Sequence, residues 1–239
     1  SKVTGSAQFL DDLEMQGLAY GGIIRSPYPH AKAVSIDIKE AAKIPGVLGI
    51  LCPQDVPQVK FNCTGFLPHD ALIKDEEILT LHPKHEGDRI VAIVAETYEI
   101  CKRAMEAVKI EYEVLPAIMT IEEAMKDDAP LVNPALYDTN CFYHKIGERG
   151  NIEEGFTKSD FIFEGTYHTP TAHPIPMEPI SCIAHWTRDN KLIIWANSQT
   201  PYQDRRILAE QFSLRECDII LRRATIGSGF GQREELHNQ

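Results

Sequence analysis

Hydrophobic and polar residues along the first half of the chain switch between a period of two and a helical spacing. Alternation with β-branched and aromatic residues predicts strands, and apolar residues spaced three to four apart predict helices. Thr97 suits the N-cap of the longer predicted helix. The predicted strands cover residues 18–25, 33–38, 47–51, 89–95 and 109–115, and the predicted helices cover 39–43 and 98–108. The strand–helix–strand order of 89–115 indicates an α/β domain that closes near residue 118.

Two stretches break this regularity. Residues 52–88 are rich in Pro, His and charge, which predicts a long loop, and residues 119–158 carry many turn formers and one short helical segment at 121–126. The second stretch is typical of a connector. The sequence therefore predicts a first domain at 1–118, a connector at 119–158 and a second domain at 159–239.

The last part of the chain has a different pattern, dominated by short strands. We expect strands at 161–169, 181–186, 191–196 and 217–226 and a helix at 205–212. Residues 188–190 form a turn signal between the second and third of these strands, which favours a hairpin. Both halves mix helices and strands, so the predicted fold class is α+β with an N-terminal α/β domain.

Composition excludes several classes of protein. The chain has 239 residues, of which 43% are hydrophobic, so it can bury a core. Its 24 Lys and Arg against 35 Asp and Glu give a net charge of −11, which disfavours nucleic acid as a partner. The sequence shows neither an apolar run long enough for a membrane helix nor the apolar core of a secretory signal, so we expect a cytoplasmic protein without a membrane partner. Its six cysteines are scattered without a C-x-x-C pair, which favours reduced, mostly buried thiols.

Three local features suggest a ligand site in the second half. Gly227–Gly231 places three glycines after a strand, where the backbone is free to approach a ligand or simply to turn tightly. Glu178, between Met177 and Pro179, is suited either to orienting a ligand or to stabilising a turn. Gln199, at the end of the strand at 191–196, offers both a donor and an acceptor to a neutral polar ligand, but without further context an ordinary strand-end turn is favoured.

The sequence gives little support for a dinucleotide-binding site, a zinc site or a catalytic nucleophile. A dinucleotide-binding G-x-G-x-x-G motif needs glycine where Gln232 stands, and the histidine pairs His82/His85 and His168/His173 lack the cysteine or carboxylate partners of a zinc site. The sequence has no G-x-S-x-G elbow and no cysteine with an evident base partner, so it indicates no serine or cysteine nucleophile.

Taken in order, several short motifs resemble the molybdenum hydroxylases, the xanthine dehydrogenase and aldehyde oxidase family. The opening and closing segments of the family's α/β "hammerhead" domain resemble Val3–Phe9 with Asp11, Ser26–Ala31, Pro45–Val47, Arg89–Thr97 and Glu111–Pro116. Signatures of its molybdenum-cofactor-binding domain resemble Met177–Pro179, Ser198–Pro201 and Gly229–Gly231. The resemblance implies a hammerhead domain followed by the first part of a molybdenum-cofactor-binding α+β domain.

The resemblance also implies roles for particular residues. Gln199 would lie beside the apical oxo group of the molybdenum centre, and Gly229, Phe230 and Gly231 would belong to a loop against the pterin. Glu234 matches the position of a substrate-orienting glutamate in purine-oxidising members. No protein side chain would hold the metal, because the pterin does.

For the intact assembly, the resemblance implies hydroxylation of a purine, aldehyde or N-heteroaromatic carbon with oxygen derived from water. The cofactor would be molybdopterin or its cytosine dinucleotide form carrying molybdenum, with FAD and 2Fe-2S clusters on partner subunits or domains. The general base and most pterin contacts of the family lie beyond the position of Gln239, so we expect a fragment or one chain of a split subunit, inactive without the remainder. The alternative is a non-catalytic assembly or scaffold module derived from this family.

Overall fold

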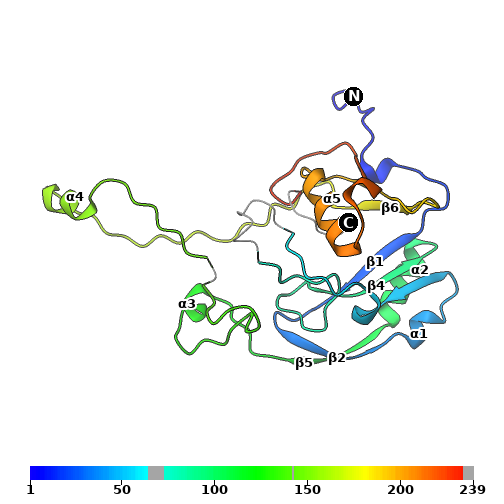
Figure 1. Ribbon diagram of the computed structural model, residues 1–239, viewed down its shortest axis with the longest axis horizontal. Coiled ribbons are helices and arrows are strands. Elements are labelled where there is room, and N and C mark those ends of the chain that lie inside the picture. The colour runs from blue at the N-terminus through cyan, green and yellow to red at the C-terminus, as the bar shows by residue number, and fades with distance from the viewer. Residues whose placement is uncertain (64–72, 142, 234–239) are drawn as a thin grey trace.

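A computed structural model describes residues 1–63, 73–141 and 143–233, which form two units and a projecting arm (Figure 1). The first unit holds an antiparallel sheet in the order β1–β4–β3 and a second antiparallel pair, β2–β5. Helix α2 packs on the sheet at β1 and β4. The elements of this unit are β1 (Tyr20–Arg25), β2 (Ala31–Asp37), α1 (Lys39–Ala42), β3 (Val47–Leu51), β4 (Arg89–Ala95), α2 (Tyr98–Ala107) and β5 (Lys109–Val114).

The predicted elements of the first unit are confirmed, and their burial explains why they form. β4 is the central strand, and its apolar run buries Ile90, Val91 and Ile93 completely. Helix α2 begins at the expected N-cap, because the Thr97 hydroxyl accepts a hydrogen bond from the Ile100 amide at 3.3 Å. Its buried face then packs Ala104 into the same core.

The second unit is a three-stranded sheet with one helix against it. Strands β6 (Cys182–Trp186) and β7 (Leu192–Ala196) form the predicted hairpin, and β8 (Ile219–Arg223) pairs parallel to β7. The helix, α5 (Pro201–Phe212), begins four residues earlier than predicted, with Pro201 in its first turn, where a missing N–H is tolerated. Parallel pairing of β8 places the glycine loop that follows it beside the end of β7.

The loop predicted at 52–88 packs against both units. Phe61 forms an antiparallel bridge with Glu76 and is buried in the core of the second unit. The Lys74 ammonium pairs with the Glu210 carboxylate of α5. This segment therefore fastens the first unit to the second through contacts that have no periodic signal. The described residues also include three short 3-10 helices: η1 (Leu10–Asp12), η2 (Pro53–Asp55) and η4 (Glu216–Asp218).

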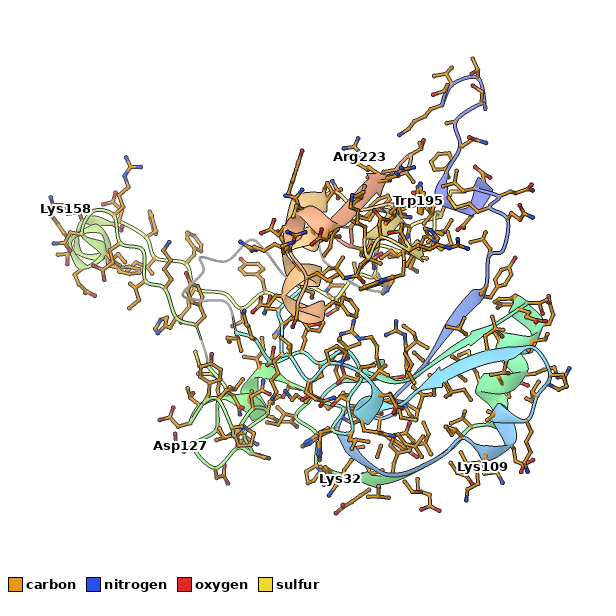
Figure 2. All side chains as sticks on the ribbon, turned by 45° about the vertical axis from the view of Figure 1, so that its right-hand side comes forward. Lys32, Lys109, Asp127, Lys158, Trp195 and Arg223 are labelled. Atoms are coloured by element: carbon orange, nitrogen blue, oxygen red, sulfur yellow. The ribbon has the colours of Figure 1, made fainter. Side chains whose placement is uncertain are left out.

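The connector contains α3 (Ile121–Ala124), as predicted, and a second helix, α4 (Ile152–Lys158), which the sequence interpretation missed. Helix α4 and the chain on either side of it extend away from both units as an arm, with Lys158 far from the second unit (Figure 2). The strand predicted at 161–169 is wrong for the described structure. These residues are exposed and no described strand pairs with them, because a strand pattern forms a strand only where a neighbour completes the hydrogen-bond ladder.

The cysteine thiols differ in burial more than expected. Cys52 and Cys101 are buried, whereas Cys141 and Cys217 are exposed, so the expectation of mostly buried thiols is wrong for the latter two. Cys141 lies in the connector and Cys217 in η4, where no sheet covers them. Among the described residues, none of the helices has both the length and the apolar composition that crossing a bilayer requires.

Candidate functional site

The glycine loop after β8 turns sharply in a left-handed conformation. Phe230 has φ = 51° and Gly231 has φ = 79°, and the Gln232 amide donates to the Gly229 carbonyl at 3.1 Å. Left-handed backbone is uncommon for a residue with a side chain. The Phe230 side chain is 59% exposed. The loop therefore presents an aromatic ring and a glycine backbone at its tip.

The end of β7 meets this loop directly. Asn197 and Ser198 are buried after the strand, and Gln199, the next residue, is exposed. The backbone N–H of Gln199 donates to the Arg233 carbonyl at 2.8 Å. A Cβ atom built on Gly229 would lie 2.5 Å from Cδ of the Gln199 side chain. The structure thus brings together Gln199 and Gly229, two residues that the sequence placed in one site.

A buried ion pair fastens the base of the loop. Arg233 donates from Nη2 to the Glu178 carboxylate at 3.0 Å and to the Glu178 carbonyl at 2.6 Å, and its side chain is fully buried. The other carboxylate contacts of Glu178 come from the Gly227 amide at 2.7 Å and from Nδ2 of Asn197 at 3.2 Å. Sequence reasoning raised Glu178 but gave no signal for Arg233 or Asn197.

The N-terminal segment also reaches the site. Phe9 forms a parallel bridge with Thr225 just after β8, and the Ser181 hydroxyl donates to the Asp11 carboxylate at 3.0 Å. Between this segment, the loop and the chain before β6 lies a cavity of about 600 Å³. Its lining includes Phe9, Asp11, Glu178, Ser228, Phe230 and Arg233. The early motif at Val3–Phe9 gave no indication that this segment forms part of the site.

The donor and acceptor set suits a polar, uncharged cofactor surface. Glycine positions bring main-chain N–H groups within reach of a ligand, and the Gln199 amide can donate without removing a proton from it. Within the described chain, Oδ1 of Asn197 and Nε of Arg233 are buried without a hydrogen-bond partner. No group of three or more His, Cys, Asp or Glu among the residues described could hold a metal ion. The buried atoms of Asn197 and Arg233 that lack a partner and the glycine backbone of the loop fit a cofactor with polar atoms.

Of two further residues in the second half of the sequence, the structure describes only Cys182. Glu234 lies outside the described residues, so its predicted role is not tested by the structure. Burial raises the pKa of the Cys182 thiol to about 11, so this β6 residue is protonated at neutral pH and is a weak nucleophile.

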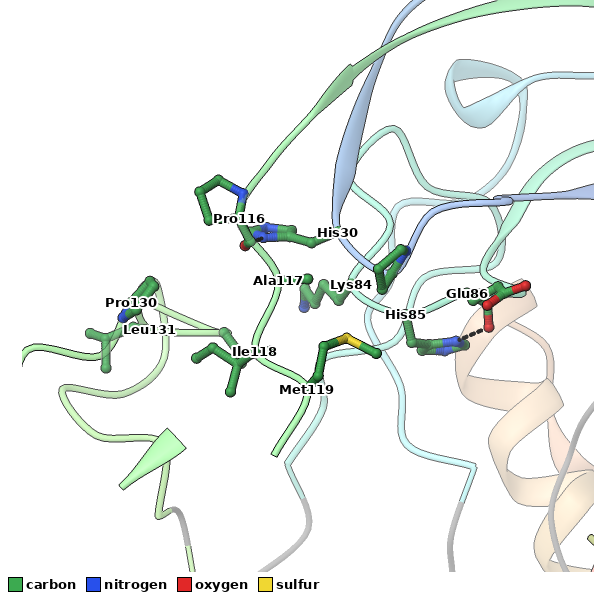
Figure 3. A pocket seen from close by; sticks show the side chains of 12 residues that line it. His30, Lys84, His85, Glu86, Pro116, Ala117, Ile118, Met119, Pro130 and Leu131 are labelled. Atoms are coloured by element: carbon green, nitrogen blue, oxygen red, sulfur yellow. Dashed lines mark hydrogen bonds between the residues drawn. The ribbon is translucent and has the colours of Figure 1, made fainter. Parts of the chain in front are cut away.

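A second, smaller cavity of about 250 Å³ lies at the junction of the first unit and the connector (Figure 3). It is lined by His30, Lys84 and Met119, among others. His85, also in the lining, pairs with Asp88 at 2.9 Å, and this hydrogen bond raises the pKa of the imidazole to about 9. None of the predicted site residues lines this cavity.

Comparison with known proteins agrees with the geometry. The family model described as "aldehyde oxidase and xanthine dehydrogenase, a/b hammerhead domain" matches residues 4–116, and the model described as "molybdopterin cofactor-binding domain" matches residues 135–238. The xanthine dehydrogenase molybdenum-binding subunit of Escherichia coli O157:H7 is 31% identical over 241 residues, covering 99% of this chain and 32% of that protein. The nicotinate dehydrogenase large molybdopterin subunit of Eubacterium barkeri is 31% identical over 239 residues, covering all of this chain and 54% of that protein.

Solved structures give the same result. Quinoline 2-oxidoreductase from Pseudomonas putida 86 superposes with a TM-score of 0.85 at 26% identity, over 99% of this chain and 30% of that one. The aldehyde oxidoreductase from Desulfovibrio gigas superposes with a TM-score of 0.83 at 25% identity, over 93% of this chain and 25% of that one. The chain therefore spans between a quarter and about half the length of these relatives.

Proposed function

Because the chain belongs to the molybdenum hydroxylase family of xanthine dehydrogenases and aldehyde oxidases, as a hammerhead domain followed by the start of a molybdopterin-binding domain, we propose that it forms part of a molybdenum-dependent hydroxylase subunit. The substrate is a purine, an aldehyde or an N-heteroaromatic compound, hydroxylated at carbon with oxygen derived from water. The observation that carries the proposal is the close approach of Gly229 to the Gln199 side chain at the base of the glycine loop.

In this proposal each site residue has one task. Gln199 donates an N–H to an oxygen of the bound cofactor, and the backbone of Gly229, Phe230 and Gly231 packs against the pterin. Glu234 orients the substrate. The cofactor, molybdopterin or its cytosine dinucleotide form carrying molybdenum, supplies the hydroxylation chemistry when bound. The chain itself orients the cofactor, through the Gln199 side chain and the backbone of the glycine loop.

The proposal includes the rest of the assembly. The partners are the remainder of the molybdenum subunit and iron–sulfur and FAD subunits or domains, which take up the electrons released by substrate oxidation. Two separate cores support domain limits near residues 118 and 159, with a connector between them, although Phe61 of the first segment joins the second core. The scattered cysteine thiols support a cytoplasmic location.

The test is metal analysis by mass spectrometry on the purified chain, alone and in complex with the remainder of the subunit. We expect molybdenum only in the complex. Absence of molybdenum from a well-folded complex would contradict the proposal and favour a scaffold module.

A variant pair makes the test specific to the site. We expect Gln199→Ala to slow turnover of the complex while leaving molybdenum content unchanged. Gln203→Ala is the matched control, because Gln203 lies one turn into α5 and its side chain donates to the Cys63 carbonyl, away from the glycine loop. Equal turnover in the two variants would remove Gln199 from the site.

A further inference from the structure

Glu178 occupies an unusual position for a residue in a turn. Its side chain is 15% exposed, it precedes β6, and its neighbour Met177 is fully exposed. Both carboxylate oxygens are engaged. Oε1 accepts from Asn197, while Oε2 accepts from the Gly227 amide and the Arg233 guanidinium. This carboxylate therefore joins three segments that are far apart in the sequence.

The contacts of Glu178 bracket the glycine loop. Gly227 opens the loop and Arg233 follows it, so one carboxylate holds both ends of the five residues between them. The Arg233 carbonyl in turn accepts a hydrogen bond from the backbone N–H of Gln199 at 2.8 Å. A chain of contacts thus leads from Glu178 through Arg233 to Gln199.

From these contacts we propose that Glu178 is a positioning residue for the loop that carries Phe230 and Gly231. It acts through Gly227 and Arg233, since its oxygens are already bound by protein donors. The inference rests on the proposed function only in assigning this loop to the cofactor. The negative charge is the essential property, because three donors, one from Asn197 and two from the ends of the glycine loop, converge on one carboxylate.

Two substitutions at position 178 separate charge from shape. Glu178→Gln keeps the size of the side chain, but its NH₂ group must face at least one of the three donors in either orientation. Glu178→Asp keeps the charge on a shorter side chain. If Glu178 only filled space, glutamine would be tolerated better than aspartate, whereas a positioning charge predicts the opposite order.

The chain offers a matched control in the first unit. Glu76 accepts the Cys63 amide at 2.9 Å and pairs with Arg89 at 3.5 Å, so it also joins a backbone N–H to an arginine. Glu76→Gln removes a comparable partly buried charge whose contacts, with Cys63 and Arg89, do not include the glycine loop.

The experiment is amide hydrogen exchange, followed by mass spectrometry, on the purified 239-residue chain. We expect Glu178→Gln to accelerate exchange at residues 227–233 at least ten-fold while β7 stays protected. Glu178→Asp should recover part of the protection, and Glu76→Gln should leave the loop unchanged. Arg233→Lys, which cannot reproduce the guanidinium contacts, should release the same residues and provides a second route if Glu178→Gln folds poorly.

Two results would overturn the inference: unchanged loop exchange in Glu178→Gln, or acceleration spread equally over β6, β7 and β8. In the assembled subunit, Glu178→Gln should also lower molybdenum content several-fold relative to Glu76→Gln, and equal contents would contradict a role toward the cofactor. If the unsubstituted assembly contained no molybdenum, the proposed function would fail, but the exchange experiment would still decide whether Glu178 positions the loop.

Discussion

Replacing Gly229 by alanine tests the contact on which the candidate site depends. The added Cβ atom would lie 2.5 Å from Cδ and 2.8 Å from Nε2 of Gln199, and closer still to Oε1. Two carbon atoms in contact are normally about 3.5–4.0 Å apart. The side-chain amide of Gln199 must therefore move by about 1 Å, because the methyl group is bonded directly to Cα and has no torsion that could move it away.

The magnitude follows from the freedom of the glutamine. Gln199 is exposed, so its side chain can leave the contact by adopting a less favourable torsion at about 0.5–1.5 kcal/mol. For a chain of this length, that lowers Tm by only a few degrees, at about 2–4 °C per kcal/mol. If the side-chain amide makes one transition-state hydrogen bond worth about 1 kcal/mol, kcat/KM of the assembled enzyme should fall by about five-fold.

The assay is a double-mutant cycle with Gln199→Ala, measured by thermal unfolding and by turnover of the assembly. Without the glutamine side chain, the methyl group at position 229 meets no obstacle from it, so the penalty of Gly229→Ala should nearly vanish. Gly231→Ala is the control, because its Cβ would meet no atom within 4 Å but its φ of 79° strains any residue with a side chain. Its stability penalty should be the same with and without Gln199. Equal penalties for Gly229→Ala in both backgrounds would refute the reasoning.

Three further predictions concern other parts of the chain. The hydrogen bond that the His85 imidazole donates to the Asp88 carboxylate raises the pKa of His85 from 6.5 to about 9. The pair therefore stabilises the fold fully below pH 6.5 and loses this effect as the pH rises through 9. Urea unfolding should show a smaller loss of stability over that range in His85→Gln, and an identical pH dependence of the two proteins would contradict the prediction. Burial raises the pKa of Cys182 to about 11, so at pH 8 iodoacetamide should modify exposed Cys217 much faster, as peptide mass spectrometry would show, and equal rates would be inconsistent with that burial. Phe161 and Phe163 are 82% and 95% exposed, so replacing both with serine should weaken self-association of the isolated chain, measured by light scattering. Unchanged association would mean that the chain self-associates through a different surface.

Local patterns predicted most of the secondary structure because each depends on neighbours in the sequence. The apolar run of β4 and the N-cap at Thr97 are read from residues within one element, and both are confirmed. The strand predicted at 161–169 shows the limit of this reasoning. Its aromatic and β-branched residues are typical of strands, but a ladder needs a second strand, and no described strand pairs with it.

The site residues divide in the same way. Gln199 and the loop at Gly229–Gly231 stand out because glycine-rich and amide-bearing turns at strand ends have a recognisable chemistry. Arg233 and Asn197 carried no such signal, since a buried guanidinium is defined by its partner. That partner, Glu178, lies 55 residues before Arg233.

The sequence by itself determined most of the strands and helices, the acidic net charge and the glycine loop that follows β8, because these depend on periodicity, charge and residue type. Only the tertiary structure decided that Phe9 lies beside Thr225, that Phe61 enters the second core and that one carboxylate holds both ends of the glycine loop. These contacts join residues separated by 49 positions or more in the chain. The contacts at the glycine loop form because parallel pairing of β7 and β8 brings the segments that follow these strands to the same end of the sheet, and no local pattern encodes that pairing.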